Sequence, residues 1–152
     1  MSKRWGTPTW FFMHTFAEHI TDDFYKSNAK EICNIFMYMF QNLPCTECTK
    51  HAVQYSKLKL TPKMIQSKED LKQFFYTFHN HVNKRLGKPI FKHLDNYKKY
   101  NLYSIFNKFS HYFCRDPVFL AGFIRTKNRH YFCTQMKNIL QRFKNHMDQQ
   151  ST

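Results

Sequence analysis

The segment SKEDLKQFFYTFHNHVNKRLGKP, residues 67–89, is typical of one long helix with both ends specified. Ser67 followed by Asp70 resembles a capping box in which aspartate replaces the usual glutamate. An apolar stripe runs along the helix: Phe74, Phe75 and Phe78. Such a stripe is more typical of a core face than of a cofactor wall. Gly87 and then Pro89 end the helix, because glycine adopts the left-handed cap and proline cannot continue the ladder.

Similar apolar spacing on both sides of this segment predicts further helices. Thr9 is a plausible cap for a first helix to about residue 20, which the Asp22-Asp23 pair then breaks. Ser27 fits as the N-cap of a second helix to about residue 41. Pro44 marks the boundary before a third helix over about 45–57. Downstream we expect a short helical segment at about 94–100, a helix with an apolar stripe from Leu102 to Phe113, and a terminal helix whose stripe runs from Phe132 to Phe143.

Neither strand alternation nor an internal repeat appears between these segments. The sequence therefore predicts an all-α protein, a helical bundle with additional C-terminal helices. Its 152 residues suit one domain that buries a core without depending on disulfides. No apolar run approaches the roughly 20 residues that cross a bilayer, and the first residues do not resemble a signal peptide. We expect a soluble, uncleaved chain that does not enter a membrane.

Basic side chains outnumber acidic ones by 24 to 10, which gives a formal net charge of +14. Such a charge suits nucleic acid, an acidic partner or a phosphorylated ligand. The excess is spread along the chain, as in an ordinary solvated surface. A basic nucleic-acid-binding helical module therefore stays an alternative, but a disfavoured one.

Five cysteines are too few and too unevenly spaced for a secreted disulfide scaffold, and only Cys45 and Cys48 are close together. A CxxC pair at the start of a helix suits electron transfer, because the helix dipole stabilises a thiolate there. The same spacing is half a zinc site, with His51 as a third ligand and Cys33, Cys114 or Cys133 as a fourth. The pair alone leaves redox chemistry and a zinc-stabilised module about equally favoured.

Three blocks together resemble the Erv/ALR family in order and spacing: Trp5-Gly6-Thr7-Pro8-Thr9-Trp10 with His14, Leu43-Pro44-Cys45-Thr46-Glu47-Cys48, and Phe78-His79-Asn80-His81-Val82-Asn83-Lys84-Arg85-Leu86-Gly87-Lys88-Pro89. The resemblance covers roughly the first 100 residues. His51-Ala52 after the CxxC is closer still to the compact enzymes of large DNA viruses. The resemblance to the Erv/ALR family implies a four-helix bundle of that type with a short fifth helix. It also implies an FAD-dependent sulfhydryl oxidase that uses oxygen and forms hydrogen peroxide.

The resemblance also assigns roles residue by residue. Cys48 matches the cysteine next to the flavin, and Cys45 matches the outer cysteine that exchanges with the substrate. The main residues that match the cofactor surroundings are Trp10, His14, His79, Asn80, Asn83 and Lys88. Weaker lining positions are Gly6, Thr9, Tyr55, Val82 and Lys84, and Tyr100 stands where a flavin-lining tryptophan is usual. No metal is expected.

The implied partners are a protein dithiol or a small thiol-disulfide carrier, with oxygen as acceptor and a second copy in a homodimer. A viral member would act in the host cytoplasm or the virion. Residues 1–100 correspond to the FAD-binding core. Residues 101–152 have no counterpart in it, and we expect a helical extension that packs on the core or at the dimer interface.

Cys114 and Cys133 in this extension have three interpretations: a disulfide between two helices, a shuttle pair that feeds Cys45, or separate buried thiols. Phe113 and Phe132 precede the two cysteines, so both lie beside apolar positions. Burial opposes exchange with a moving partner. A structural role is therefore the preferred hypothesis, and a shuttle ranks lowest.

Overall fold

The computed structural model of the chain describes residues 4–92, 95–114 and 123–152. Within these residues the secondary structure is helical throughout, which confirms the all-α prediction. The elements in chain order are α1 (Gly6–His19), α2 (Asp22–Phe40), α3 (Thr46–Ser56), α4 (Lys68–Arg85), the 3-10 helix η1 (Asp95–Lys99), α5 (Leu102–Cys114) and α6 (Phe123–Gln150). The short helical segment predicted for 94–100 corresponds to η1, and Leu94 lies outside the described residues.

The first helix begins earlier than its predicted cap. Trp5 is the N-cap of α1, and Thr9 lies one turn inside the helix. The Thr9 hydroxyl donates a hydrogen bond of 2.5 Å to the Trp5 carbonyl instead of capping a free N–H group. Threonine makes such back-bonds inside helices and also caps them, so the residue type alone does not fix the boundary. The helix ends at Ile20, whose backbone is extended.

The second helix also begins earlier than predicted, at Asp22 and not after Ser27. The Thr21 side chain caps it by accepting from the Phe24 N–H at 3.3 Å. Asp22 therefore starts a helix where a break was expected, since acidic side chains in a first turn interact favourably with the helix dipole. The polar signal near Ser27 corresponds to a kink, where Asn28 has φ −127° and ψ 17°.

The predictions for α3 and α4 are confirmed. Cys45 is the N-cap of α3. The Ser67 hydroxyl accepts from the Asp70 N–H at 3.1 Å, and the Asp70 carboxylate accepts from the Gln66 N–H at 2.9 Å. The two bonds form a variant of the capping box. The Asp70 carboxylate accepts from Gln66, one residue before the N-cap, where the usual capping box has the N-cap residue itself. Gly87, with φ +68°, follows the end of α4 in the left-handed conformation that glycine adopts without strain.

Phenylalanine rings from four helices fill the centre of the bundle. Phe12 of α1 stacks on Phe109 of α5 with ring centroids 4.8 Å apart. Phe36 of α2 meets Phe16 of α1 at 5.2 Å and Phe75 of α4 at 4.9 Å. All five side chains are fully buried. Phe75 thus belongs to the core, as the apolar stripe of α4 predicted.

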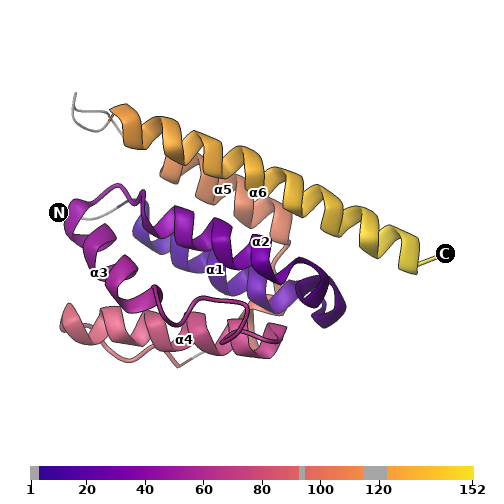
Figure 1. The fold of residues 1–152 in the computed structure, drawn as a ribbon, viewed down its shortest axis with the longest axis horizontal. Coiled ribbons are helices and arrows are strands. Elements are labelled where there is room, and N and C mark those ends of the chain that lie inside the picture. Colours follow the sequence, from indigo (N-terminus) through magenta and orange to yellow (C-terminus); the bar gives the residue numbers. More distant parts are fainter. Residues whose placement is uncertain (1–3, 93–94, 115–122) are drawn as a thin grey trace.

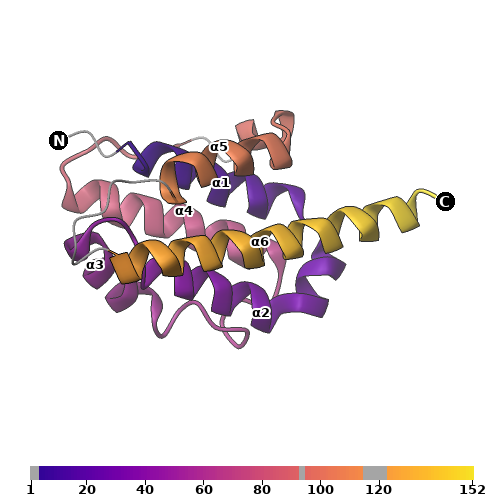
Figure 2. The ribbon, with the colours of Figure 1, turned by 90° about the horizontal axis from the view of Figure 1, so that it is seen from above.

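The two C-terminal helices pack on one side of the bundle formed by α1 to α4. Helix α5 contacts α1, and α6 contacts both α2 and α5. In Figure 1, α5 and α6 lie above α1 and α2, while α4 lies on the opposite side. The turned view in Figure 2 shows α6 running along the bundle, with its C-terminal end projecting past the other helices. A disulfide between Cys114 and Cys133 joins α5 to α6, and Cys33 is a free buried thiol.

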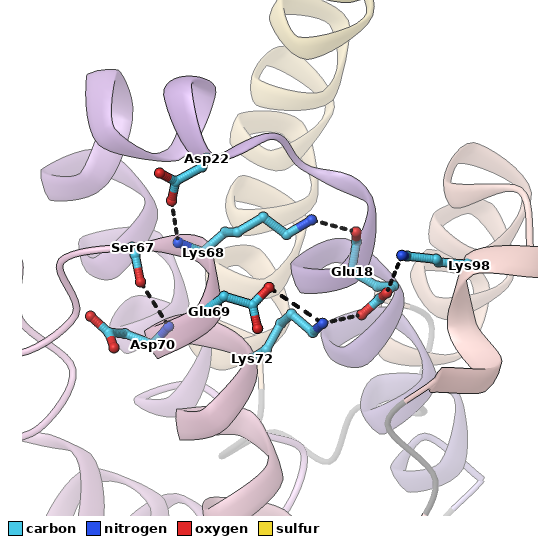
Figure 3. Close-up of polar contacts among 8 residues, drawn as sticks. All are labelled: Glu18, Asp22, Ser67, Lys68, Glu69, Asp70, Lys72 and Lys98. Atoms are coloured by element: carbon cyan, nitrogen blue, oxygen red, sulfur yellow. Dashed lines mark hydrogen bonds and ion pairs between the residues drawn. The ribbon is translucent and has the colours of Figure 1, made fainter.

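One buried carboxylate connects α1 to α4 and η1 (Figure 3). The Glu18 side chain is 3% exposed and lies 2.8 Å from the Lys72 ammonium and 3.7 Å from that of Lys98. Lys68 donates to the Glu18 backbone carbonyl at 2.8 Å, and its own N–H donates to Asp22 at 3.0 Å. Because a buried charge is costly without partners, these lysines fix where the end of α1 meets α4.

Candidate active site

The Cys45–Cys48 disulfide lies at the N-terminus of α3. Cys45 has an extended backbone, and its sulfur accepts a hydrogen bond of 3.2 Å from the Cys48 N–H. Both side chains are partly buried against the core. A thiolate released here would face the positive end of the helix dipole and a backbone donor, both of which stabilise it. The helix start therefore makes this disulfide suited to reduction and re-formation.

The face of α3 that carries Cys48 continues through Ala52 to Tyr55, at spacings of four and three residues. Ala52 is buried, and the Tyr55 ring lies 5.2 Å from Phe78 and 4.5 Å from His81 of α4. Phe78 in turn lies 5.2 Å from Trp10 of α1. A continuous set of ring contacts thus leads from the helix of the cysteines to α4 and α1.

Trp10, His14 and His79 form a stacked group where α1 meets α4. The Trp10 and His79 rings are parallel within 3°, with centroids 4.0 Å apart. His14 Nε2 and His79 Nδ1 are 2.8 Å apart, which is a hydrogen bond. One of these nitrogens must donate and the other accept, so the contact requires at least one neutral ring. Trp10 and His14 were predicted from one sequence block and His79 from another, and the fold brings the three together.

Both histidines are held in the neutral form. Burial, and then the proximity of His79, lowers the pKa of His14 to about 3. Burial, and then the positive charge of Lys88, lowers the pKa of His79 to about 4. Neutral imidazoles stack on and hydrogen-bond to a planar partner without bringing a charge into the site.

Two further aromatic residues, Phe91 and Tyr97, complete this group. The Phe91 ring lies 4.8 Å from His14 and 4.6 Å from His79, and the Tyr97 ring lies 5.1 Å from His14. Neither was predicted as a site residue, because the three sequence blocks that assign the site end at Pro89. The one available sequence signal was that aromatic residues come directly after the 78–89 block.

The two asparagines of the 78–89 block hold the loop that follows α4. Asn80 bonds to both backbone groups of Phe91, at 2.7 and 3.1 Å. The Asn83 side chain donates to the Pro89 carbonyl at 3.1 Å. Their amides are thus engaged with backbone at 89–91.

The other predicted positions are more dispersed. Val82 is partly buried against the core, and Lys84 and Lys88 are exposed. Gly6 is the first residue of α1. Tyr100 packs on Phe11 with centroids 4.8 Å apart, so Tyr97 and not Tyr100 is the tyrosine whose ring contacts His14.

The exposed end of α4 is basic. Burial and then the charges of Lys59, Arg85, His51 and Lys84 lower the pKa of His81. Lys59 also lies over the Tyr55 ring, 3.9 Å from its centroid. Several cations therefore lie along the edge shared by α3 and α4, where they suit a phosphorylated ligand.

Two surface hollows lie away from these residues. One, of about 550 Å³, lies on the surface between α2 and α6, and its lining includes Ile35, Tyr38 and Tyr131. The second, of about 540 Å³, lies between α5 and α6. Across the part of the chain that the structure describes, no three His, Cys, Asp or Glu side chains gather as a set able to hold a metal ion.

A comparison with protein families matches residues 7–102 to the model described as the Erv1 / Alr family. This match spans more than half of the chain and includes the CxxC, the stacked histidines and η1. The chain belongs to the Erv1/Alr family. The resemblance read from the three sequence blocks is thereby confirmed, and the helical fold agrees with it.

Curated relatives of this Erv1/Alr chain occur in viruses and plants. A protein of Invertebrate iridescent virus 3 is 34% identical over 87 residues, which is 57% of this chain and 59% of that protein. The FAD-linked sulfhydryl oxidase of African swine fever virus (isolate Pig/Kenya/KEN-50/1950) is 34% identical over 86 residues, 57% of this chain and 71% of that enzyme. The FAD-linked sulfhydryl oxidase ERV1 of Oryza sativa is 31% identical over 86 residues, 57% of this chain and 43% of that enzyme. No solved structure matches significantly.

The side chains of this Erv1/Alr site fit the chemistry of a flavin dinucleotide. Flat faces of Trp10, His79 and Phe91 suit stacking on conjugated rings. The ammonium groups of Lys84 and Lys88 suit a pyrophosphate. Neutral histidines at this position also supply hydrogen bonds to a ring edge without a charge. These side chains are therefore consistent with FAD, whereas the described residues contain no group of three or more His, Cys, Asp or Glu side chains that could hold a metal ion.

Proposed function

We propose that the chain is an FAD-dependent sulfhydryl oxidase that forms disulfides in protein dithiols and passes the electrons to oxygen. The observation that carries this proposal is the Cys45–Cys48 disulfide at the start of α3. From the same helix, ring contacts run through Tyr55 and Phe78 to the group of Trp10, His14 and His79. The names of the viral and plant relatives support it. A zinc module is not favoured, because the two cysteines are bonded to each other.

Cys45 is the cysteine of the pair that exchanges with the substrate. A substrate thiolate attacks the Cys45 sulfur, so the Cys45–Cys48 bond breaks and Cys48 leaves as a thiolate. The second substrate thiol then attacks the mixed disulfide, which releases the oxidised substrate and a Cys45 thiolate. Two electrons and the substrate protons have then left the substrate. The Cys48 N–H stabilises the Cys45 thiolate, and the positive end of the α3 dipole favours a thiolate at either cysteine.

Bound FAD would accept the two electrons from the cysteine pair and deliver them to oxygen, which gives hydrogen peroxide. The chain supplies binding and orientation. Trp10, His14 and His79 would provide faces and ring-edge contacts, and Lys84 and Lys88 would meet the phosphates. The remaining proposed lining residues are Gly6, Thr9, Tyr55, Asn80, Val82, Asn83 and Tyr100. Cys48 is proposed as the cysteine next to the flavin.

The partner is proposed to be a protein dithiol or a small thiol-disulfide carrier. A viral setting, in the host cytoplasm or the virion, is supported by the viral relatives. Within the described ranges, none of the helices combines the length and apolar content that crossing a bilayer requires. Residues 1–100 are proposed as the catalytic core, with 101–152 as an extension held on it.

A homodimer is also proposed. Large apolar side chains such as Leu58 and Ile90 are 78% and 67% exposed in the single chain, so apolar surface is available for a second copy. Sedimentation of the purified protein is expected to give twice the chain mass of 18.6 kDa. A monomer at every concentration would reject the dimer and leave the oxidase proposal standing.

The absorption spectrum of the purified full chain tests the oxidase proposal. We expect a yellow protein that releases about one FAD per chain on denaturation, as a tightly bound cofactor does. Colourless protein with stoichiometric zinc would support the zinc module. Colourless protein that retains nucleic acid at moderate salt would support the basic nucleic-acid module. Either result overturns the proposal.

A further inference from the structure

The turn between α2 and α3, residues 41–45, ends at Cys45, the cysteine proposed to exchange with the substrate. Asn42 in this turn is 6% exposed, and its side-chain amide donates to the Tyr38 carbonyl, in the last turn of α2, at 2.8 Å. The other half of the amide, Asn42 Oδ1, accepts a hydrogen bond of 2.9 Å from the side chain of Asn128. One buried side chain thus connects the end of α2 to α6.

The partner of this buried amide lies on a firmly held part of the extension. Arg129, next to Asn128, is 4% exposed and donates from Nε to the Phe113 carbonyl of α5 at 2.9 Å. One turn later, the disulfide between Cys133 and Cys114 joins α6 to α5. Figures 1 and 2 both show the start of α6 at the end of the bundle that carries α3. Asn128 therefore reaches the turn from a rigid support.

The connection from Asn42 to Cys45 is short and stiff. Leu43 and Pro44 lie between them, and Leu43 is 6% exposed. Proline fixes its own φ angle and restricts the backbone of the residue before it. The Thr49 hydroxyl donates to the Leu43 carbonyl at 3.4 Å, which ties the turn to the first turns of α3. A restraint on Asn42 is therefore passed on to Cys45.

We propose that Asn128 is a positioning residue for substrate exchange and that it acts on Cys45 through Asn42. The inference rests on the proposed function, since exchange with a dithiol is the first step of that reaction. In this step a bond forms between the substrate sulfur and the Cys45 sulfur, the Cys45–Cys48 bond breaks, and its electron pair leaves on Cys48. Asn128 lies beyond the family match, which ends at residue 102, so the extension contributes to the site.

Orientation gives this contact its effect on the rate. An attacking thiolate needs the Cys45 sulfur presented to it, and small misplacements of reacting atoms slow a reaction strongly. If the turn is released from α6, it samples several orientations, and exchange slows by the fraction that remains competent.

The rate at which dithiothreitol opens each disulfide of the purified full chain tests this role. Oxygen is excluded, so that continuing turnover does not re-form the pair. Alkylation of the thiols at set times, followed by mass spectrometry of peptides, follows the two disulfides separately. Asn128→Ala should slow the opening of Cys45–Cys48 about fivefold, the effect of losing one net hydrogen bond.

The Cys114–Cys133 disulfide is the internal reference for this measurement, because it is buried between α5 and α6. It should open at the wild-type rate in Asn128→Ala. An unchanged or faster rate at Cys45–Cys48 would overturn the proposal. Equal changes at both disulfides would also overturn it, because they are what a general loosening of the extension predicts.

A double-mutant cycle shows whether Asn128 acts through Asn42. Asn42→Ala should slow the opening of Cys45–Cys48 at least as much as Asn128→Ala, because it removes both bonds of the amide. The double variant should be no slower than Asn42→Ala alone, and effects that multiply would overturn the proposal. Asn138→Ala, a change at an exposed position of α6, is the matched control and should leave both disulfides at their wild-type rates.

Asn128→Leu serves if Asn128→Ala does not fold, because leucine has a similar volume and suits a helix but cannot donate a hydrogen bond. It should also slow the opening of Cys45–Cys48 about fivefold, and a wild-type rate would overturn the proposal. Failure of the two ideas can be distinguished. A wild-type chain that binds no FAD rejects the proposed function. An active, flavin-loaded wild type whose Asn128 variants open Cys45–Cys48 at the wild-type rate rejects this inference alone.

Discussion

At the residue level, the pair of buried His14 and half-buried His79 shows how burial decides protonation. His14 is 4% exposed and shares a hydrogen bond with His79, so protonation of both rings would leave two donors facing each other. The pKa values of about 3 and about 4 follow from this environment. Proton binding by either ring therefore opposes folding.

The pH dependence of stability tests this pair. A histidine whose pKa is lowered on folding contributes its full stability above the unfolded pKa, about 6.5. That contribution is lost as the pH falls below 6.5 towards the folded values of about 3 and 4. His14→Gln should reduce the slope of unfolding free energy against pH between about 4.5 and 6, by up to about 1.4 kcal/mol per pH unit. Urea unfolding at several pH values measures it, and an unchanged slope would contradict the neutral pair.

Glu18 and its ion-pair partner Lys98 should differ in how much stability their removal costs. Glu18→Ala removes a buried carboxylate from Lys72 and should lower the free energy of unfolding by about 3 kcal/mol. Lys98→Ala removes a partner that is 77% exposed and should cost no more than about 1 kcal/mol. Denaturant unfolding of both variants measures the difference. Equal losses would mean that the buried ion pair does not hold α1 on α4.

At the element scale, the Cys114–Cys133 disulfide links α5 to α6 in a buried position. Cys114 is 4% and Cys133 7% exposed, so an incoming thiolate has little access to either sulfur. Of the three interpretations from sequence, the disulfide is the one that the structure supports. Its burial favours a structural role over a shuttle.

Replacing both cysteines tests that role. Cys114→Ser with Cys133→Ser removes a cross-link across 19 residues and should lower stability by about 3 kcal/mol. Oxidation of dithiothreitol should stay near the wild-type rate, because Cys45 and Cys48 are untouched. A variant that keeps its fold and flavin but loses oxidation of protein substrates alone would identify the pair as a shuttle.

Helix positions were predictable where the sequence carries both periodicity and an unambiguous end. Residues 67–89 have a cap, an apolar stripe and a terminal glycine, and α4 follows them closely. The start of α2 was missed because Thr21 and Ser27 are both acceptable caps, and only the packed structure selects between them. Within the site, Trp10, His14 and His79 were identified through motifs, whereas Phe91 and Tyr97 lie in segments whose position depends on tertiary contacts.

At the scale of the whole molecule, the extension covers one side of the bundle. Phe12 of α1 packs against Phe106 and Phe109 of α5, and Phe24 of α2 packs against Phe143 of α6. These rings would face water without residues 101–152. The family match ends at residue 102, so the covering helices lie beyond the part that the family model describes.

Truncation after Tyr100 tests this dependence. The shortened chain should unfold at a lower temperature or form larger assemblies, because Phe12 and its neighbours become exposed. Removal of residues 148–152, which are exposed at the end of α6, is the control and should change neither property. Thermal unfolding and sedimentation of both proteins measure the outcome. A truncated chain with wild-type stability and size would show that the extension is dispensable for the fold.

Oxygen consumption with dithiothreitol shows whether the Cys45–Cys48 pair makes this chain a thiol oxidase. The full chain should consume one O₂ and release one hydrogen peroxide for each disulfide formed, since each step moves two electrons. Cys48→Ser should abolish turnover, and Cys45→Ser should also stop it, while both variants keep their helices by circular dichroism. Wild-type rates in either variant, or no thiol-dependent oxygen uptake by a flavin-loaded wild type, would contradict the assignment of Cys45 and Cys48 as the redox pair of a sulfhydryl oxidase.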